Sequence, residues 1–198
     1  MSGNHELVRA FIAIELPTSV RLELAQLQKT LRYQCHCPAK WVDPHSIHLT
    51  LYFLGDVAPA IIENTKQAMT HAVLGQLPFE LFLDKSGVFP NPEHPRVIWI
   101  GITDKLSILK STRSKLGQLL HRNELTLEAR EFYPHLTLAR IRDEANYVER
   151  QSLQQALSSA EQTFKTSFIA QDISLIQSQL TPKGAHYITL FRAKFLSS

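Results

Sequence analysis

The sequence predicts an α+β fold in which antiparallel sheets carry helices on their outer faces. Three observations predict it: short apolar runs typical of strands alternate with helical segments, this order occurs twice, and the chain ends in two strands joined by a tight turn. The helices are too few for a bundle, and the strands are too often joined by short connections for a parallel sheet. A chain of 198 residues, 44% of them hydrophobic, can bury the core of such a fold.

The first half of the chain contains three expected strands and two expected helices. Apolar and β-branched runs indicate the strands, and apolar residues at helical spacing indicate the helices. The strands are expected over residues 8–16, 47–54 and 79–83, and the helices over residues 19–31 and 59–73.

The second half repeats this order. Strands are expected over residues 96–102 and 132–140, and helices from Asp104 to about residue 121 and over residues 147–160. Corresponding positions are 86 or 87 residues apart, as in Phe11 and Val97, His48 and His135, and Ile61 and Tyr147. We therefore predict an internal duplication of residues 8–90 and 95–170, which gives two lobes related by an approximate twofold around a central cleft. Residues 1–198 form a single bilobal domain in this interpretation.

A C-terminal hairpin follows the duplicated segments, at residues 171–196. Its expected strands, residues 172–180 and 186–195, flank a turn that contains Pro182 and Gly184. The hairpin lies outside the repeat.

The charge and the cysteines narrow the possible partners and the location. The 21 basic and 18 acidic side chains are too evenly balanced for a protein that wraps long nucleic acid, whereas a small anionic substrate is compatible. Cys35 and Cys37 are poorly spaced for a disulfide, and Cys35-His36-Cys37 lacks the second ligand pair that a structural zinc requires. No apolar run approaches the length of a membrane span. We expect a cytoplasmic monomer with no membrane contact.

The tetrapeptide His-Leu-Thr-Leu occurs twice, at residues 48–51 and 135–138. Because side chains alternate along a strand, each histidine shares a face with its threonine, and the leucines share the opposite, core face. A single such motif is most often a half-exposed histidine beside a strand-favouring threonine. Two copies at matched positions favour a functional site, because the approximate twofold would bring both polar faces to one shared cleft.

Two histidines in one cleft suit phosphodiester chemistry. One neutral imidazole takes a proton from the attacking water while the other, protonated, gives one to the leaving oxygen. Thr50 and Thr137 can donate hydrogen bonds to the non-bridging phosphate oxygens. The predicted catalytic residues are therefore His48, Thr50, His135 and Thr137, with no metal and no cofactor.

The sequence resembles the two-histidine phosphoesterases, and specifically the LigT-like RNA 2′,3′-cyclic phosphodiesterases of bacteria and archaea. The resemblance covers nearly the whole chain and is carried by FIAIELP (residues 11–17), the segment from Trp41 to Gly55, RVIWIG (96–101), PHLTLAR (134–140) and the closing segment from Ser178 to Tyr187.

This resemblance implies a LigT-like fold and the hydrolysis of RNA ends or nucleoside 2′,3′-cyclic phosphates to 2′-phosphates. The family's older name, 2′-5′ RNA ligase, implies a possible reverse reaction. The resemblance also implies that Arg140 contacts the phosphate or substrate, that Phe53 stacks on a base, and that His48 is the proton donor and His135 the acceptor. The sequence itself is nearly symmetric and leaves that last assignment open.

Three alternatives remain. The chain could act on another cyclic phosphate or a 2′-5′ oligonucleotide, or it could bind RNA ends without catalysis. A metallohydrolase with His48 and His135 as ligands is disfavoured, because no carboxylate or third histidine shares either motif.

Overall fold

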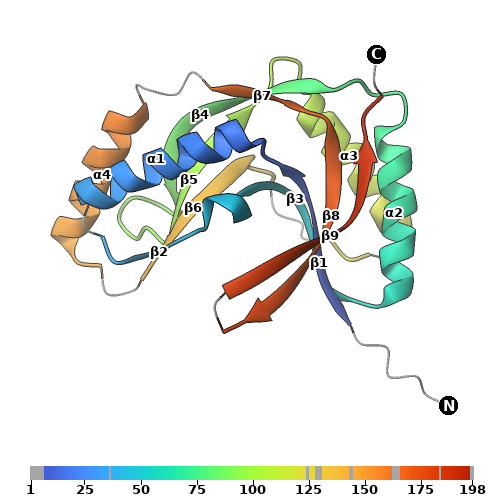
Figure 1. Cartoon of the computed structure of the whole chain (residues 1–198), viewed down its shortest axis with the longest axis horizontal. Helices are drawn as coiled ribbons and strands as arrows, with labels where there is room; N and C mark the ends of the chain where they lie inside the picture. The colour runs from blue at the N-terminus through green and yellow to red at the C-terminus, as the bar shows by residue number, and fades with distance from the viewer. Residues whose placement is uncertain are drawn as a thin grey trace.

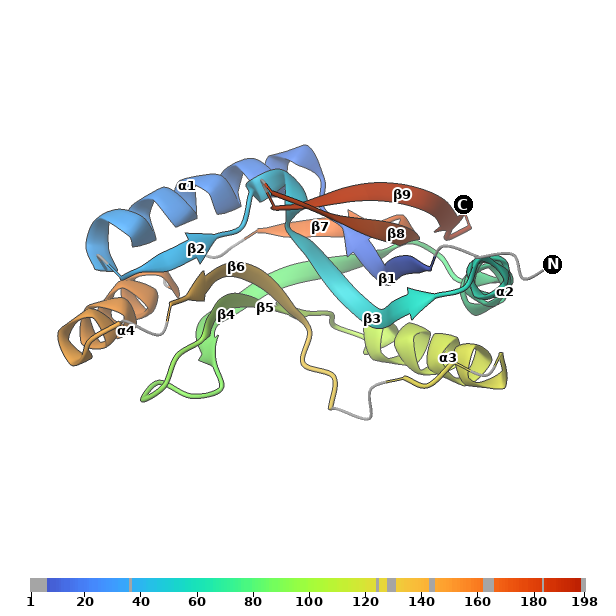
Figure 2. The ribbon, with the colours of Figure 1, turned by 90° about the horizontal axis from the view of Figure 1, so that it is seen from below.

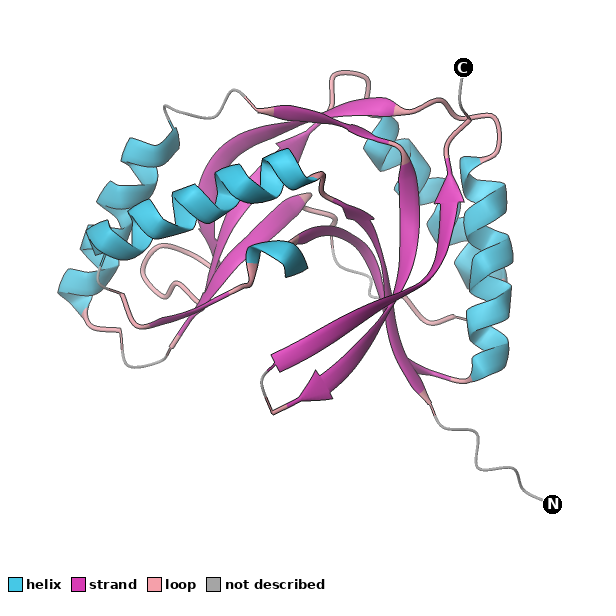
Figure 3. Cartoon of the chain, viewed as in Figure 1, coloured by secondary structure: helices cyan, strands magenta, loops and turns pink. Residues whose placement is uncertain are grey.

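The protein has an α+β fold built on one curled antiparallel sheet (Figures 1 and 3). The computed structural model describes residues 7–35, 37–123, 125–127, 131–142, 145–161, 166–182 and 184–196. The strands are β1 (Val8–Glu15), β2 (Ala39–Trp41), β3 (His48–Val57), β4 (Phe79–Phe89), β5 (Val97–Thr103), β6 (His135–Ile141), β7 (Ser167–Ala170), β8 (Asp172–Thr181) and β9 (Gly184–Lys194). The helices are α1 (Thr18–Cys35), α2 (Pro59–Val73), α3 (Ile108–Arg122) and α4 (Tyr147–Glu161), with a short 3₁₀ helix at Pro44–Ser46.

The expected strands and helices are present, with differences at their ends. β4 continues beyond Leu83, where the expected strand stops, because its pairing with β5 skips a register between Leu83 and Ser86 and then resumes. That irregularity falls on the polar stretch that ends the apolar alternation in the sequence. The short strands β2 and β7 were not expected, since three or four residues are too few for a periodic pattern.

The strand order places the two motif strands side by side at the centre of the sheet. The order is β7-β4-β5-β6-β3-β1-β8-β9, and β2 also pairs with β6. Between β3 and β6 the paired residues are Leu49 and Leu136. On either side of this central pair the order is symmetric, with β1 beside β3 and β5 beside β6. The duplication of residues 8–90 and 95–170 stays a prediction, with which this symmetric order agrees.

The helices form two pairs at opposite ends of the molecule, α1 with α4 and α2 with α3 (Figures 1 and 2). Each pair combines one helix from each half of the chain, so the two halves are intertwined rather than folded separately. Leucines of both motifs belong to the hydrophobic core that the helices cover. A small second cluster of Phe11, Ala13 and Ile176 lies apart from it, with Tyr187 packed against it.

No helix in the described part of the chain has the length and apolar character needed to cross a membrane. The predicted cytoplasmic location and monomeric state stay predictions.

Candidate active site

The pairing of β3 with β6 puts both histidine–threonine faces on one surface of the sheet. Leu49 lies opposite Leu136, so in this antiparallel register His48 lies beside Thr137 and Thr50 beside His135. The leucines are buried, whereas the histidines and threonines are only partly buried. His48 and His135 are therefore a diagonal pair, a separation of roughly 7–8 Å in a regular sheet. The register therefore puts the two imidazoles on one face of adjacent strands.

A β-bulge in β6 turns Arg140 onto the same face. The β5–β6 pairing passes from Ala139 directly to Thr137, which leaves Leu138 without a partner in the ladder. Leu138 and Ala139 both point into the core, and Arg140 is exposed. Strict alternation would have placed Arg140 on the face opposite Thr137, so the bulge is what brings its guanidinium to the histidines.

A matching bulge in β3 turns the side chain of Phe53 out of the core. The β1–β3 pairing passes from Tyr52 to Thr50 and skips Leu51, so Leu51 and Tyr52 are both buried while Phe53 is 58% exposed. Leu51 and Leu138 are 87 residues apart, the same interval that separates the two histidines. The two halves of the site thus share one irregularity, and it presents an arginine in one half and a phenylalanine in the other.

Each bulge carbonyl is held by a side chain from a helix. Gln28 of α1, which is 2% exposed, donates from Nε2 to the carbonyl of Leu138 at 2.9 Å and to that of Val42 at 2.8 Å. Arg113 of α3 donates from Nε to the carbonyl of Leu51 at 3.1 Å.

Arg113 is itself fixed in place by aromatic rings. Its guanidinium lies 4.3 Å from the ring centre of Tyr52 and 4.4 Å from that of Phe132, and the Tyr52 hydroxyl donates to its backbone carbonyl. Buried carbonyls released from the ladder need donors, so we infer that Gln28 and Arg113 stabilise the two bulges.

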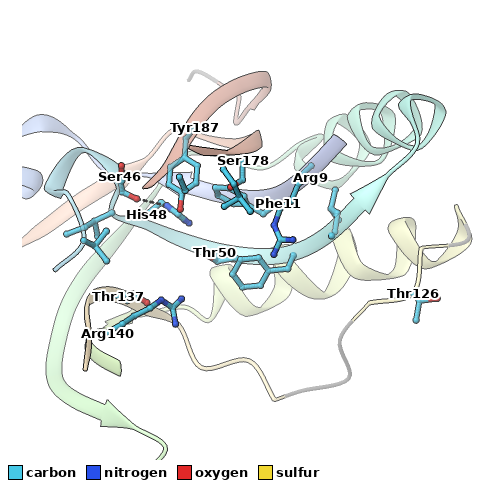
Figure 4. Close-up of a pocket in the computed structure, with 18 residues that line it drawn as sticks. Arg9, Phe11, Ser46, His48, Thr50, Thr126, Thr137, Arg140, Ser178 and Tyr187 are labelled. Carbon is cyan, nitrogen blue, oxygen red and sulfur yellow. Dashed lines mark hydrogen bonds between the residues drawn. The ribbon is translucent and has the colours of Figure 1, made fainter. Parts of the chain in front are cut away.

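A cavity of about 750 Å³ opens above this face of the sheet (Figure 4). Five of the six predicted site residues line it: His48, Thr50, Phe53, Thr137 and Arg140. Arg9 and Phe11 of β1 and Ser178 and Tyr187 of the C-terminal hairpin line it as well. The sixth predicted residue, His135, is not among the residues that line it.

Both histidine rings are oriented in the same way. Nδ1 of His48 lies 2.8 Å from the carbonyl oxygen of Ser46, and Nδ1 of His135 lies 2.6 Å from that of Tyr133, in each case two residues upstream. Because a carbonyl oxygen only accepts, Nδ1 carries the hydrogen in both rings. Nε2 of each ring therefore carries no hydrogen when the ring is neutral, and it is the nitrogen left to gain or lose a proton.

Aromatic side chains hold the two rings in position. The ring of Phe11 stacks on His48 with centroids 4.6 Å apart, and the edge of Tyr187 packs against His48 at 5.4 Å. Phe89 packs edge-on against His135 at 5.0 Å, and Trp99 lies 6.5 Å away. Such packing restricts both imidazoles to one orientation.

Comparison with known proteins identifies the family. The LigT like Phosphoesterase family matches residues 14–99. The RNA 2′,3′-cyclic phosphodiesterase of Methanothermobacter thermautotrophicus is 31% identical over 183 residues, which cover 91% of this chain and 95% of the relative. The chain belongs to the LigT-like phosphoesterases. A protein of the same name from Aeropyrum pernix is 32% identical over 88% of this chain and 96% of its own.

Solved structures share the fold. TT0787 of Thermus thermophilus is 27% identical, with a TM-score of 0.74 over 94% of this chain and 97% of that one. E. coli LigT complexed with 3′-AMP has a TM-score of 0.75 at 23% identity, over 97% of this chain and 100% of that one.

The electrostatic environment differs between the two histidines of this LigT-like phosphoesterase. Burial lowers the pKa of His48; the hydrogen bond to Ser46 and the charge of Glu15 oppose that effect, and the charge of Arg21 adds to it. Burial also lowers the pKa of His135; the hydrogen bond to Tyr133 opposes it, and the charge of Arg140 lowers the pKa further. Both rings are thus neutral more readily than a free histidine. At His48 the charges of Glu15 and Arg21 act in opposite directions, whereas at His135 the charge of Arg140 favours the neutral form.

The cysteine segment has no visible part in this site. Cys35 and Cys37 are buried free thiols, and burial raises the pKa of Cys37 to about 11. His36 lies outside the described residues. Among the residues that are described, no three His, Cys, Asp or Glu side chains gather as metal ligands do.

The sequence pattern did not reveal the supporting residues of the site. Phe11 and Tyr187 fall inside motifs that carry the family resemblance, yet their contact with His48 joins three separate strands. The hydrogen bond from Gln28 to Leu138 spans 110 residues. A buried glutamine on the apolar face of α1 is the one local signal that could have drawn attention to it.

Proposed function

We propose that this phosphoesterase hydrolyses RNA or nucleoside 2′,3′-cyclic phosphate ends to 2′-phosphates by general acid–base catalysis with His48 and His135. The observation that carries the proposal is the common orientation of the two rings, which leaves both Nε2 atoms free to act on one phosphate on the same sheet surface. The relatives named RNA 2′,3′-cyclic phosphodiesterase support the choice of substrate.

The surrounding charges favour His135 as the proton acceptor and His48 as the proton donor. His135 is neutral and its Nε2 takes a proton from water, whose oxygen attacks phosphorus. The bond from phosphorus to the 3′-oxygen breaks, and protonated His48 gives its Nε2 proton to that oxygen. Arg140 favours the neutral form of His135, and Glu15 favours the charged form of His48 against the opposing charge of Arg21.

The remaining residues hold the phosphate. Thr50 and Thr137 donate hydrogen bonds to its non-bridging oxygens, which carry the negative charge as water attacks. Arg140 adds a fixed positive charge at the same position, and Phe53 offers an exposed ring on which a base can stack. A ribose 5′-hydroxyl in place of water would yield a 2′–5′ linkage by the same proton transfers, but hydrolysis dominates because water is in excess.

The proposal is tested by incubating the protein with each nucleoside 2′,3′-cyclic phosphate in EDTA and identifying the product by ³¹P NMR. We expect complete conversion to the nucleoside 2′-phosphate. Formation of the 3′-phosphate would contradict the assignment of the leaving oxygen. Binding without turnover would indicate an RNA-end binding module, and loss of turnover in EDTA would indicate a metal-dependent enzyme.

A further inference from the structure

Arg9 occupies the same face of the sheet as the catalytic residues. Along β1 the side chains of Arg9, Phe11 and Ala13 alternate with Ala10 and Ile12, which are buried in the main core. Phe11 stacks on His48, and Arg9 lines the same cavity two residues earlier. Figure 4 shows the guanidinium of Arg9 directed into the cavity, with Thr50 between it and Arg140 in this view.

The cavity holds more positive charge than one cyclic phosphate requires. Among the described residues that line it are two arginines, Arg9 and Arg140, and no aspartate or glutamate. A 2′,3′-cyclic phosphodiester carries a single negative charge, which Arg140 and the protonated histidine already meet. The second arginine therefore fits a second anionic group on the same substrate.

The ion pair between Arg9 and Asp56 is weak, so another anion can take the place of Asp56. Its Nη1 lies 3.7 Å from Oδ2 of Asp56, and the two side chains are 56% and 55% exposed. Exposed ion pairs of this length contribute little to stability. A phosphate oxygen can therefore replace Asp56 as the partner of Arg9 with little loss of stability. The Asp56 carboxylate remains nearby, however, and repels the negative charge of that phosphate.

Arg9 lies further along β1 than the ring that stacks on His48, where the next group of a longer substrate would lie. Phe11 lies 4.6 Å from the His48 ring, and Arg9 is two residues further along the strand, a rise of about 7 Å. The exposed ring of Phe53 lies 6.2 Å from that of Phe11. It can stack on the base of a nucleotide whose cyclic phosphate lies at His48 and whose 5′-phosphate lies at Arg9. In RNA the next phosphate is on the 5′-oxygen of the terminal nucleotide, whereas a nucleoside 2′,3′-cyclic phosphate has only a hydroxyl there.

We infer that Arg9 binds the 5′-phosphodiester of the nucleotide that carries the cyclic phosphate, so that the enzyme selects RNA ends over free nucleoside 2′,3′-cyclic phosphates. This inference rests on the proposed function and names the substrate class within it. The ligand group is a phosphoryl group on the 5′-oxygen. In an RNA end it is a diester, and in a free nucleotide it is a monoester.

The test compares three substrates with the same terminal base: a nucleoside 2′,3′-cyclic phosphate, its 5′-phosphorylated form, and a dinucleotide ending in the cyclic phosphate. We expect kcat/KM of the wild type to be about tenfold higher for the dinucleotide than for the nucleoside, as one charge-assisted contact would give. In Arg9→Gln this ratio should fall to near one, and in Asp56→Asn it should rise. Arg122→Gln, an exposed arginine on α3 that is not among the cavity-lining residues, is the matched control and should keep the wild-type ratio.

A ratio that Arg9→Gln leaves unchanged would overturn the inference, and so would a wild type without preference for the dinucleotide. A gain confined to the 5′-phosphorylated nucleotide would mean that the site selects free nucleotides instead of RNA. Calorimetric binding of the dinucleotide and nucleoside 2′-phosphates gives a second ratio that needs no turnover. If no substrate is hydrolysed, the proposed function fails, and this binding ratio still decides whether Arg9 recognises the 5′-phosphodiester.

Discussion

Replacing Gln28 by methionine removes one of the two donors to the Leu138 carbonyl in the bulge while nearly conserving side-chain volume. The Leu138 carbonyl keeps a second donor, the backbone N–H of Val42 at 2.9 Å, so the Val42 carbonyl is the group left without its side-chain donor. A fully buried acceptor without a partner costs about 1–3 kcal/mol, and this carbonyl is only partly buried, so we expect about 1 kcal/mol. For a chain of this length the melting temperature should therefore fall by roughly 2–4 °C.

The functional consequence should appear in substrate binding. Because the bulge directs Arg140 to the phosphate, Gln28→Met should raise KM by about tenfold and change kcat less, as expected when a binding contact is misplaced. In an Arg140→Ala background the same substitution should add little to KM, since the arginine that it misplaces is already gone. Steady-state kinetics of the four proteins in this cycle measure the coupling.

Thr65→Val is the matched control for this experiment. Thr65 is fully buried in α2 and its hydroxyl donates to the carbonyl of Ile61, so the variant loses a buried hydrogen bond far from the bulge. It should lower the melting temperature without moving KM. If Gln28→Met also left KM unchanged, or if its effect were additive with Arg140→Ala, Gln28 would be a purely structural residue and the reasoning would be refuted.

Three further predictions concern the reaction itself. Thr50→Ala and Thr137→Ala should each lower kcat by roughly 10- to 100-fold, measured with a nucleoside 2′,3′-cyclic phosphate, because each removes one hydrogen bond to the reacting phosphate; unchanged kcat would remove them from the mechanism. The pH profile of kcat/KM should be bell-shaped with its maximum below about pH 6.5. Burial lowers the pKa of both His48 and His135 in the free enzyme and so moves both limbs of the profile to lower pH. A maximum above about pH 7.5 would contradict this. Arg140→Ala should raise KM more than Arg140→Lys does, since lysine keeps the charge, and equal KM values in all three proteins would exclude a role in binding.

Sequence periodicity was sufficient to predict which faces of the motif strands are polar and which belong to the core. The alternation in HLTL separates His48 and Thr50 from Leu49 and Leu51, and the structure shows the leucines buried. Strict alternation puts Arg140, three positions past Thr137, on the core face, so its side chain can reach the cavity only if the strand bends or ends between them. The location of that bend could not be predicted, since a bulge is defined by the register of a partner strand distant in sequence.

Contacts between distant segments account for the rest of what the sequence did not reveal. The packing of α1 against α4 and of α2 against α3 joins the two halves of the chain, and no local pattern encodes the choice of partner. The same holds for Tyr187, which reaches His48 only because β9 pairs with β8 and β8 with β1. Local patterns predict faces and elements, whereas the walls of the cavity depend on strand order.

The most direct test of the two-histidine mechanism is the turnover of His48→Ala, His135→Ala and the double variant in EDTA with a dinucleotide 2′,3′-cyclic phosphate. Each single variant should lose at least ~10²-fold in kcat, the lower end of what a positioned acid or base contributes. Because both histidines act in one transition state, the double variant should lose much less than the product of the two single losses. A folded His48→Ala or His135→Ala protein that turned over at close to the wild-type rate would contradict the mechanism.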